Sequence, residues 1–299
     1  MQLLLIKFEN FRMKCLSRIL PLVTIILLNS VGSAQAATNG PVAARAQGES
    51  LIPPNYLSIA FHKPNYLLPY YYTGSPDNAA YMGTTPNNER LKHSEIKYQV
   101  SLKLPVWKNI FNFPSSLFLA YSQLSYWQLY NHRSFVREND YEPEIFLANE
   151  VNWRLSQEWH VNFMNVGLVH QSNGFGNTLE RSWNRLYLEA IASNDNWMIS
   201  IKPWLVLSKH NNNQNITNYL GYGRFLVAYK IHQHVISIQA HNLIEGGARH
   251  ATAELTWSFP VIPYVKGYLQ VISGYGQSLI EYNHRTNSVG IGIALNDWV

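Results

Sequence analysis

Apolar and polar residues alternate along most of the chain from His93 onward, and this period of two is typical of β-strands with two different faces. In the segment 251–259, for example, Ala, Leu, Trp and Phe at odd positions alternate with Thr, Glu and Ser. Turn residues separate one alternating segment from the next. We predict twelve strands, at residues 94–104, 116–130, 143–155, 158–170, 182–193, 196–208, 218–231, 234–242, 249–259, 264–273, 278–284 and 287–296.

A soluble β-sandwich would show the same alternation, but three features favour a membrane-spanning barrel. The N-terminus indicates export, the strand count is even, and the strand lengths are near the ~9–11 residues that a tilted spanning strand needs. Short turns such as 193–196 alternate with longer ones such as 210–217, as in outer-membrane barrels. Charged residues make up only 14% of the chain and aromatic residues 13%. We therefore predict an all-β fold: a transmembrane antiparallel β-barrel of about twelve strands with an N-terminal arm.

Residues 1–36 have the features of a secretory signal peptide. Basic residues precede the apolar run 19–28, and Ala34-Gln-Ala36 is a small-residue cleavage site, although Met13 could equally be the true start. The only cysteine, Cys15, lies within this segment, so the exported chain has no disulfide framework. We expect residues 37–92 to form a flexible lead-in and an N-terminal arm, and residues 93–299 to form the barrel. The formal net charge of +5 does not indicate nucleic-acid binding, because the basic residues outside the N-terminus are scattered.

The lipid-facing side of such a barrel should be apolar and its lumen polar. In the segment 196–208 this places Trp197 and Ile201 outside, and Ser200, Lys202 and Ser208 inside. A wide pore is not expected, because bulky and charged residues are predicted to fill the lumen.

The same parity places three polar residues, His170, Ser172 and Asn184, on the outer face near one rim of the barrel. A polar group that faces hydrocarbon is costly and suggests a functional site. Ser172 could act as a nucleophile whose proton passes to His170, and Asn184 on the next strand could orient the imidazole ring. The N–H of Gly174 could stabilise a developing oxyanion. The alternative is a polar strand end followed by an ordinary Ser-Asn-Gly turn.

The turn after this pair is rich in oxygen donors. The side chains of Asn177, Thr178 and Glu180, together with turn carbonyls, suit a hard cation such as Ca²⁺. The alternative is a solvated turn with weak calcium affinity.

Several motifs resemble those of the outer-membrane phospholipase A family, from about Tyr98 to the C-terminus. The motifs are His170-Gln-Ser172-Asn-Gly174, Arg181-Ser-Trp-Asn184-Arg185, Lys202-Pro-Trp204, Tyr121-Ser-Gln123, Trp127-Gln128-Leu129, Arg137-Glu138, Tyr141-Glu-Pro143, Ser273-Gly-Tyr-Gly-Gln-Ser-Leu-Ile280 and Leu295-Asn-Asp297. The resemblance implies a calcium-dependent enzyme of the bacterial outer membrane, with phospholipase A1, phospholipase A2 and lysophospholipase activity. Carried over by position, Ser172 is the nucleophile, His170 the base and Asn184 the orienting residue, with Gly174 as oxyanion donor.

The resemblance also implies Ca²⁺ as cofactor, with ligands at Arg133, Ser134, Phe175, Asn177 and Glu180. This chain departs from the family pattern there, because Asn177 stands where an aspartate is usual and Glu180 where a serine is usual. The carboxylate has either moved to another ligand position, or the calcium site is weakened.

The resemblance further implies an active homodimer, and Gln123 matches a polar residue of the dimer face. Its alternative role is that of a single satisfied polar group near the aromatic belt. Two other functional readings remain open: a non-catalytic outer-membrane barrel, either a narrow pore or a surface interaction protein, and a family member that has lost metal binding and activity.

Overall fold

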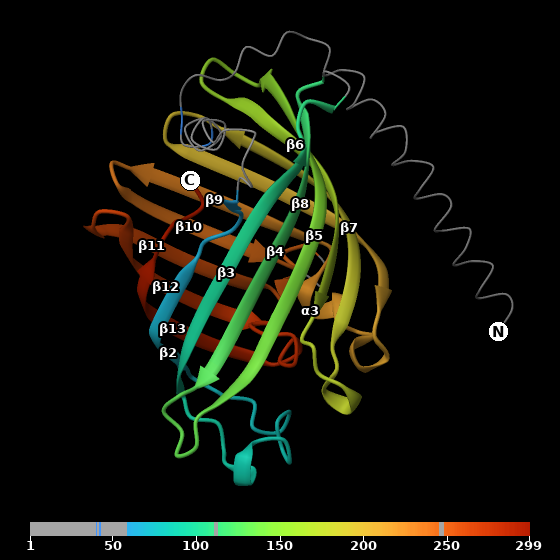
Figure 1. Cartoon of the computed structure of the whole chain (residues 1–299), viewed down its shortest axis with the longest axis vertical. Helices are drawn as coiled ribbons and strands as arrows, with labels where there is room; N and C mark the ends of the chain where they lie inside the picture. Colours follow the sequence, from blue (N-terminus) through green and yellow to red (C-terminus); the bar gives the residue numbers. More distant parts are fainter. Residues whose placement is uncertain (1–39, 41, 43–58, 111–112, 245–247) are drawn as a thin grey trace, which may run out of the picture.

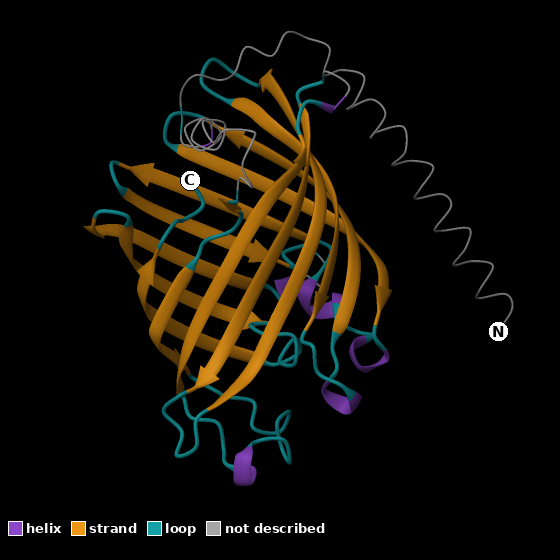
Figure 2. Cartoon of the chain, in the orientation of Figure 1, coloured by secondary structure: helices purple, strands orange, loops and turns teal. Residues whose placement is uncertain are grey.

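The computed structural model describes Gly40, Val42 and residues 59–110, 113–244 and 248–299. The predicted signal peptide and most of the predicted lead-in lie outside these described residues. Twelve long strands, β2 to β13, form one antiparallel sheet that winds around a central lumen (Figures 1 and 2). These strands are β2 Tyr66–Thr73, β3 Ser94–Trp107, β4 Ser115–Gln128, β5 Phe135–Arg154, β6 His160–Ser172, β7 Ser182–Ser193, β8 Trp197–Lys209, β9 Gly223–Ile231, β10 His234–His241, β11 Thr252–Ile262, β12 Val265–Tyr275 and β13 Arg285–Ala294.

The sheet closes because its first and last strands pair. β13 pairs with β2, β2 pairs with β3, and every later strand pairs with the next one along the chain. The short strand β1, Ala60–Phe61, adds a two-residue pairing on β3. Within the described residues no helix is long and apolar enough to cross a membrane. The predicted fold class, an all-β antiparallel barrel of twelve strands, is confirmed.

The connections differ at the two ends of the barrel. Tight turns such as 194–196 lie at one end of the barrel, and longer loops, several with short helices, extend from the other end, which is the lower one in Figures 1 and 2. The helices are η2 Pro86–Asn88, η4 Asn177–Leu179, η5 Asn211–Asn213 and α3 Thr217–Leu220. The predicted strand 218–231 therefore begins too early, because residues 217–220 are helical.

Two strand predictions are wrong, and the two errors cancel in the strand count. Residues 278–284 form turns, not a strand: the loop folds into the mouth of the barrel, where the backbone N–H of Leu279 and of Ile280 donate to Asp140 and Glu138 of β5. The strand that completes the count is β2, which lies in the segment 37–92 that we assigned to the N-terminal arm. The barrel thus begins at Tyr66. Pro69 obscured this strand, since proline cannot donate to the ladder, and the β2–β3 register shifts next to it.

The outer surface is apolar, as the alternation predicts. Trp197 and Ile201 are 41% and 52% exposed, whereas Ser200 and Lys202 are buried on the lumen side. The predicted orientation of Ser208 is wrong. It was predicted to face the lumen, but a register shift in the β7–β8 pairing turns it outward, where it lies opposite Asn184. Such a β-bulge inserts one extra residue and reverses the facing of those that follow.

Charged side chains from different strands pair on the lumen side of the barrel wall. Arg137 of β5 donates to both carboxylate oxygens of Glu95 on β3, at 3.0 and 2.8 Å, and to Glu281 at 2.9 Å. Nearer the short turns, Glu144 of β5 accepts from Lys202 of β8 at 3.3 Å and from the hydroxyl of Tyr187. These pairs tie distant strands together through the lumen.

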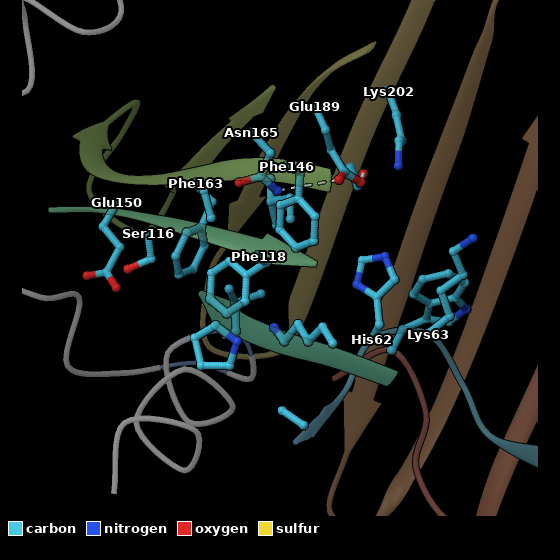
Figure 3. A pocket seen from close by; sticks show the side chains of 18 of the residues that line it. His62, Lys63, Ser116, Phe118, Phe146, Glu150, Phe163, Asn165, Glu189 and Lys202 are labelled. Carbon is cyan, nitrogen blue, oxygen red and sulfur yellow. Dashed lines mark hydrogen bonds between the residues drawn. The ribbon is translucent and has the colours of Figure 1, made fainter. Parts of the chain in front are cut away.

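A cavity of about 580 Å³ lies inside the barrel (Figure 3). Phe118 and Phe146 stack on one side of it, with ring centroids 5.1 Å apart, and Phe163 also lines the cavity. His62 and Lys202 lie toward the other side, where both contact Glu144. The lumen is thus partly filled by side chains, as the sequence predicted.

Candidate active site

The three polar residues of the sequence analysis lie on two paired strands at the end of the barrel with the long loops. Ser172 is the last residue of β6, and His170 lies shortly before it on the same strand. Asn184 lies close to the start of β7, directly opposite His170 in the register. Their neighbours Val169 and Arg185 are buried on the lumen side. The structure therefore places all three side chains on the outer face of the barrel.

His170 and Asn184 are joined by a hydrogen bond of 2.8 Å between Nδ1 and Oδ1. An amide oxygen can only accept, so Nδ1 of His170 carries the proton. This tautomer leaves a lone pair on Nε2, which is the atom that can take a proton from a nucleophile. The pair therefore has the geometry of a base held by a neutral orienting group.

Ser172 shares the outer face of β6 with His170, two residues away, which corresponds to about 6.5–7 Å between Cα atoms. Its Oγ accepts a hydrogen bond of 3.1 Å from the backbone N–H of Gly174. Among the described residues no hydrogen bond joins Ser172 Oγ to His170. Catalytic hydrogen bonds are often loose without substrate and tighten in the complex, so this spacing is compatible with proton transfer.

The turn after Ser172 is fixed by an asparagine that the sequence analysis did not single out. The buried side chain of Asn173 donates to Leu179 O at 2.8 Å and accepts from the N–H of Arg181 at 3.0 Å. Gly174 then has a φ of +67°, and a Cβ at this position would lie 2.7 Å from the ring of Tyr141. Both the backbone angle and the close ring require glycine here. Its N–H is consequently held beside Ser172, the candidate nucleophile.

The candidate calcium ligands of this turn lie in η4 and just after it. Asn177 has a φ of +57°, and its carbonyl accepts from the side chain of Asn212 at 2.6 Å. Glu180 is half-exposed, and its carboxylate lies 3.5 Å from Nε2 of His210. His210 and Asn212 belong to the loop between β8 and β9, which the sequence analysis did not connect with this site. Two loops thus meet at the proposed ligands.

Among the described residues no hydrogen bond or ion pair joins Glu180 to the remaining candidate ligands Arg133, Ser134 and Phe175. Arg133 and Ser134 are exposed in the loop between β4 and β5, and the N–H of Arg133 lies 3.5 Å from Glu89. Phe175 and Phe135 both pack against the buried cluster that contains Tyr81 and Leu91. The two loops are therefore anchored on a common apolar cluster. Within the described residues no group of three or more His, Cys, Asp or Glu side chains is placed to hold a metal ion.

Gln123, the candidate dimer residue, lies on the same outer surface. Its Oε1 accepts from Tyr121 at 2.9 Å and its Nε2 donates to Ser125 at 3.0 Å. Gln123 is the register partner of Tyr141, and Tyr141 is the register partner of Ser172. The candidate dimer residue is therefore two strands away from the candidate nucleophile.

Ser208 is the neighbour of the site that sequence reasoning missed. Its Oγ accepts a hydrogen bond of 2.7 Å from Nδ2 of Asn184. Strand parity could not find it, because parity continues unbroken only where a strand has no bulge.

Comparisons with known proteins agree with this architecture. The family model described as phospholipase A1 matches residues 42–295. A phospholipase A1 from Klebsiella pneumoniae is 37% identical over 239 residues, which cover 79% of this chain and 82% of the relative. Two solved structures are similar over most of their length. One is outer membrane phospholipase A from Escherichia coli in an active-site mutant that replaces an asparagine by alanine. It is 35% identical with a TM-score of 0.76, covering 82% of this chain and 94% of the other.

The second structure is the Salmonella typhi outer membrane phospholipase, a dimer with bound calcium. It is 36% identical with a TM-score of 0.77, and the match covers 85% of this chain and 97% of the other. The phospholipase A1 family model covers most of the chain, and the Klebsiella pneumoniae relative is more than 30% identical over most of its length. The chain belongs to the phospholipase A1 family.

Proposed function

We propose that this protein is a calcium-dependent phospholipase A of the bacterial outer membrane, with Ser172, His170 and Asn184 as its catalytic triad. The observation that carries the proposal is the outward-facing His170–Asn184 hydrogen bond, on the same strand face as Ser172. A polar site of this kind on an apolar barrel surface suits a substrate that arrives sideways from the membrane.

In the first step Ser172 Oγ attacks the carbonyl carbon of an acyl ester, while Nε2 of His170 takes its proton. The Nδ1–H of His170 stays bonded to Asn184, which holds the ring in place as it becomes charged. The carbonyl oxygen becomes an oxyanion, and the N–H of Gly174, which now donates to Ser172, is near enough to stabilise it. The intermediate collapses to an acyl-enzyme, and His170 returns the proton to the lysophospholipid as it leaves.

In the second step water replaces the alcohol. His170 takes a proton from the water, whose oxygen attacks the acyl carbon, and Ser172 leaves as the proton returns to its Oγ. The products are the free fatty acid and the original enzyme. Because Asn184 is neutral, it orients the ring but supplies no negative charge to stabilise the imidazolium.

The residues at the site fit a calcium ion, although weakly. If calcium binds here, Glu180 would supply the carboxylate, and the carbonyls of Phe175, Arg133 and Ser134 and the oxygen atoms of Asn177 would supply neutral donors, which are the kind that Ca²⁺ accepts. When bound, the ion adds positive charge near the oxyanion and the lipid phosphate. A dimer and bound calcium are recorded for the similar Salmonella typhi protein, which supports both proposals for this chain.

The dimer proposal also has a geometric reason. Ser172 lies at the outer surface, so a lone barrel leaves the acyl chain of a bound lipid in contact with membrane lipid. A second barrel packed over the row from Gln123 to Ser172 would cover that chain. The non-catalytic pore is the weaker reading, since buried charged pairs such as Arg137–Glu95 occupy part of the lumen.

The test is a set of alanine variants assayed for ester hydrolysis in mixed detergent–phospholipid micelles with calcium. We expect Ser172→Ala and His170→Ala to lower kcat by at least about 10³-fold, and Asn184→Ala to lower it on the order of 10²-fold. The folded barrel of each variant is checked by its heat-dependent mobility in gel electrophoresis. Equal and total loss in all three would contradict the neutral-orienter account, and full activity in Ser172→Ala would remove the triad.

A further inference from the structure

The hydrogen-bond chain of the site extends one residue beyond the triad. His170 donates from Nδ1 to Oδ1 of Asn184 at 2.8 Å, and Nδ2 of Asn184 donates to Oγ of Ser208 at 2.7 Å. Asn184 thus uses both ends of its amide, one on each neighbouring strand. The side chain that orients the base is itself held by Ser208.

A bulge in β8 at this point sets the direction of the Ser208 side chain. Asn184 pairs with Ser208 and Arg185 pairs with Val206, so Leu207 is an extra residue between them. In a regular strand Ser208 would share the lumen-facing side with Lys202 and Trp204, which are buried. The bulge brings its hydroxyl to the outer face instead. β-Bulges are over-represented beside active sites, where they redirect a side chain.

The hydrogen bond from Asn184 to Ser208 matters because the orienting group is neutral. A carboxylate would stabilise the imidazolium by its charge, but an amide has only the partial negative charge of its oxygen. When Nδ2–H donates to Ser208, the amide is polarised and Oδ1 becomes a stronger acceptor. The same bond keeps Oδ1 directed at His170, because a rotated amide would direct its NH₂ group at Nδ1 and oppose the productive tautomer.

We propose that Ser208 is a positioning residue for catalysis that acts through Asn184. The inference rests on the triad assigned under the proposed function. Ser208 contacts neither the substrate nor the reacting atoms. Its hydroxyl anchors the amide that holds the base, and the bulge in β8 is the structural feature that makes this possible.

The experiment compares Ser208→Ala with Ser208→Thr, which keeps a hydroxyl at the same position. Ser273→Ala is the matched control, since Ser273 on β12 also forms an outer-face serine–asparagine hydrogen bond, in which its Oγ donates to Asn287 Oδ1 at 2.7 Å, far from the triad. All variants are assayed in calcium-containing mixed micelles, together with Asn184→Ala, the double variant Asn184→Ala/Ser208→Ala, and Ser172→Ala.

We expect Ser208→Ala to lower kcat by about fivefold to tenfold with little change in KM, as for the loss of one neutral hydrogen bond. Ser208→Thr and Ser273→Ala should retain the wild-type kcat. The double variant should be no slower than Asn184→Ala, because Ser208 acts only through that residue.

Two results would overturn the inference alone: a wild-type kcat in Ser208→Ala while Ser172→Ala is inactive, or losses in Ser208→Ala and Asn184→Ala that multiply in the double variant. The second result would mean a separate structural effect. Full activity in Ser172→Ala would overturn the triad and this inference with it, so failure of the proposed function is distinguishable.

Discussion

Gln123 and Ser172 lie on either side of Tyr141 in one cross-strand row on the outer surface of the barrel. Because neighbouring strands are ~4.8 Å apart, the two residues are on the order of 10 Å apart. Any surface that packs on Gln123 therefore also lies beside Ser172, the proposed nucleophile. Dimerisation and catalysis can be coupled through this row without any movement inside the barrel.

The first prediction concerns Gln123 itself. Gln123→Ala removes the hydrogen bonds to Tyr121 and Ser125 and any bond across a dimer face. A few-fold weaker dimer is expected, measured by sedimentation equilibrium in detergent with calcium, with activity falling in parallel at low protein concentration. Asn287→Ala, on the outer face of β13, serves as the control. If the dimerisation constant of Gln123→Ala equals that of the control, Gln123 is only a satisfied polar group.

The second prediction concerns the backbone at the oxyanion donor. Gly174→Ala forces a side chain into a left-handed conformation and against the ring of Tyr141, at 2.7 Å. We expect kcat to fall on the order of 10²-fold, as for the loss of one oxyanion donor, while the barrel stays folded. The matched control is Gly176→Ala, because a Cβ there meets nothing within 4 Å. Similar kinetics in the two variants would argue against Gly174 as the donor.

The third prediction concerns the proposed calcium ligands. Glu180→Ala removes the carboxylate of the site, so the calcium concentration for half-maximal activity should rise about tenfold. Glu158→Ala, at an exposed turn on the opposite end of the barrel, is the control. Chelation of calcium should abolish activity in the wild type. An unchanged calcium titration in Glu180→Ala would remove this residue from the site.

The fourth prediction concerns the buried ion pairs of Arg137 inside the lumen. Arg137→Ala leaves Glu95 and Glu281 buried without their cation. Breaking a buried ion pair in this way costs about 3–5 kcal/mol, which should appear as a lower free energy of unfolding in detergent–urea titrations. Arg154→Ala, on an exposed side chain, should change it by less than about 0.5 kcal/mol. Equal stability of the two variants would show that the lumen network adds nothing to the fold.

Strand alternation predicted the barrel well, because each strand has one face toward lipid and one toward the lumen. It placed Trp197 and Ile201 outside and Lys202 inside, as observed. It failed at 278–284 for a physical reason. There the apolar residues Leu279 and Ile280 are buried by a loop that folds into the barrel mouth, and burial alone does not distinguish such a loop from a strand.

The site was predictable only in part. His170, Ser172 and Asn184 follow from parity on two adjacent strands, and the family resemblance suggested their roles. Ser208 could not be found in this way, because a single inserted residue in β8 reverses its facing. Contacts between loops, such as Asn212 with Asn177, depend on how two loops fold over each other, and no local pattern records that.

The central claim is that Ser172 is the nucleophile, and covalent labelling tests it most directly. A long-chain alkylsulfonyl fluoride reacts with an activated serine: Oγ bonds to sulfur and fluoride leaves. The refolded protein with calcium would be treated with this reagent and mapped by mass spectrometry. The account predicts one label, on Ser172, with much slower labelling in His170→Ala. A label on another residue, or equal labelling of Ser172→Ala, would contradict it.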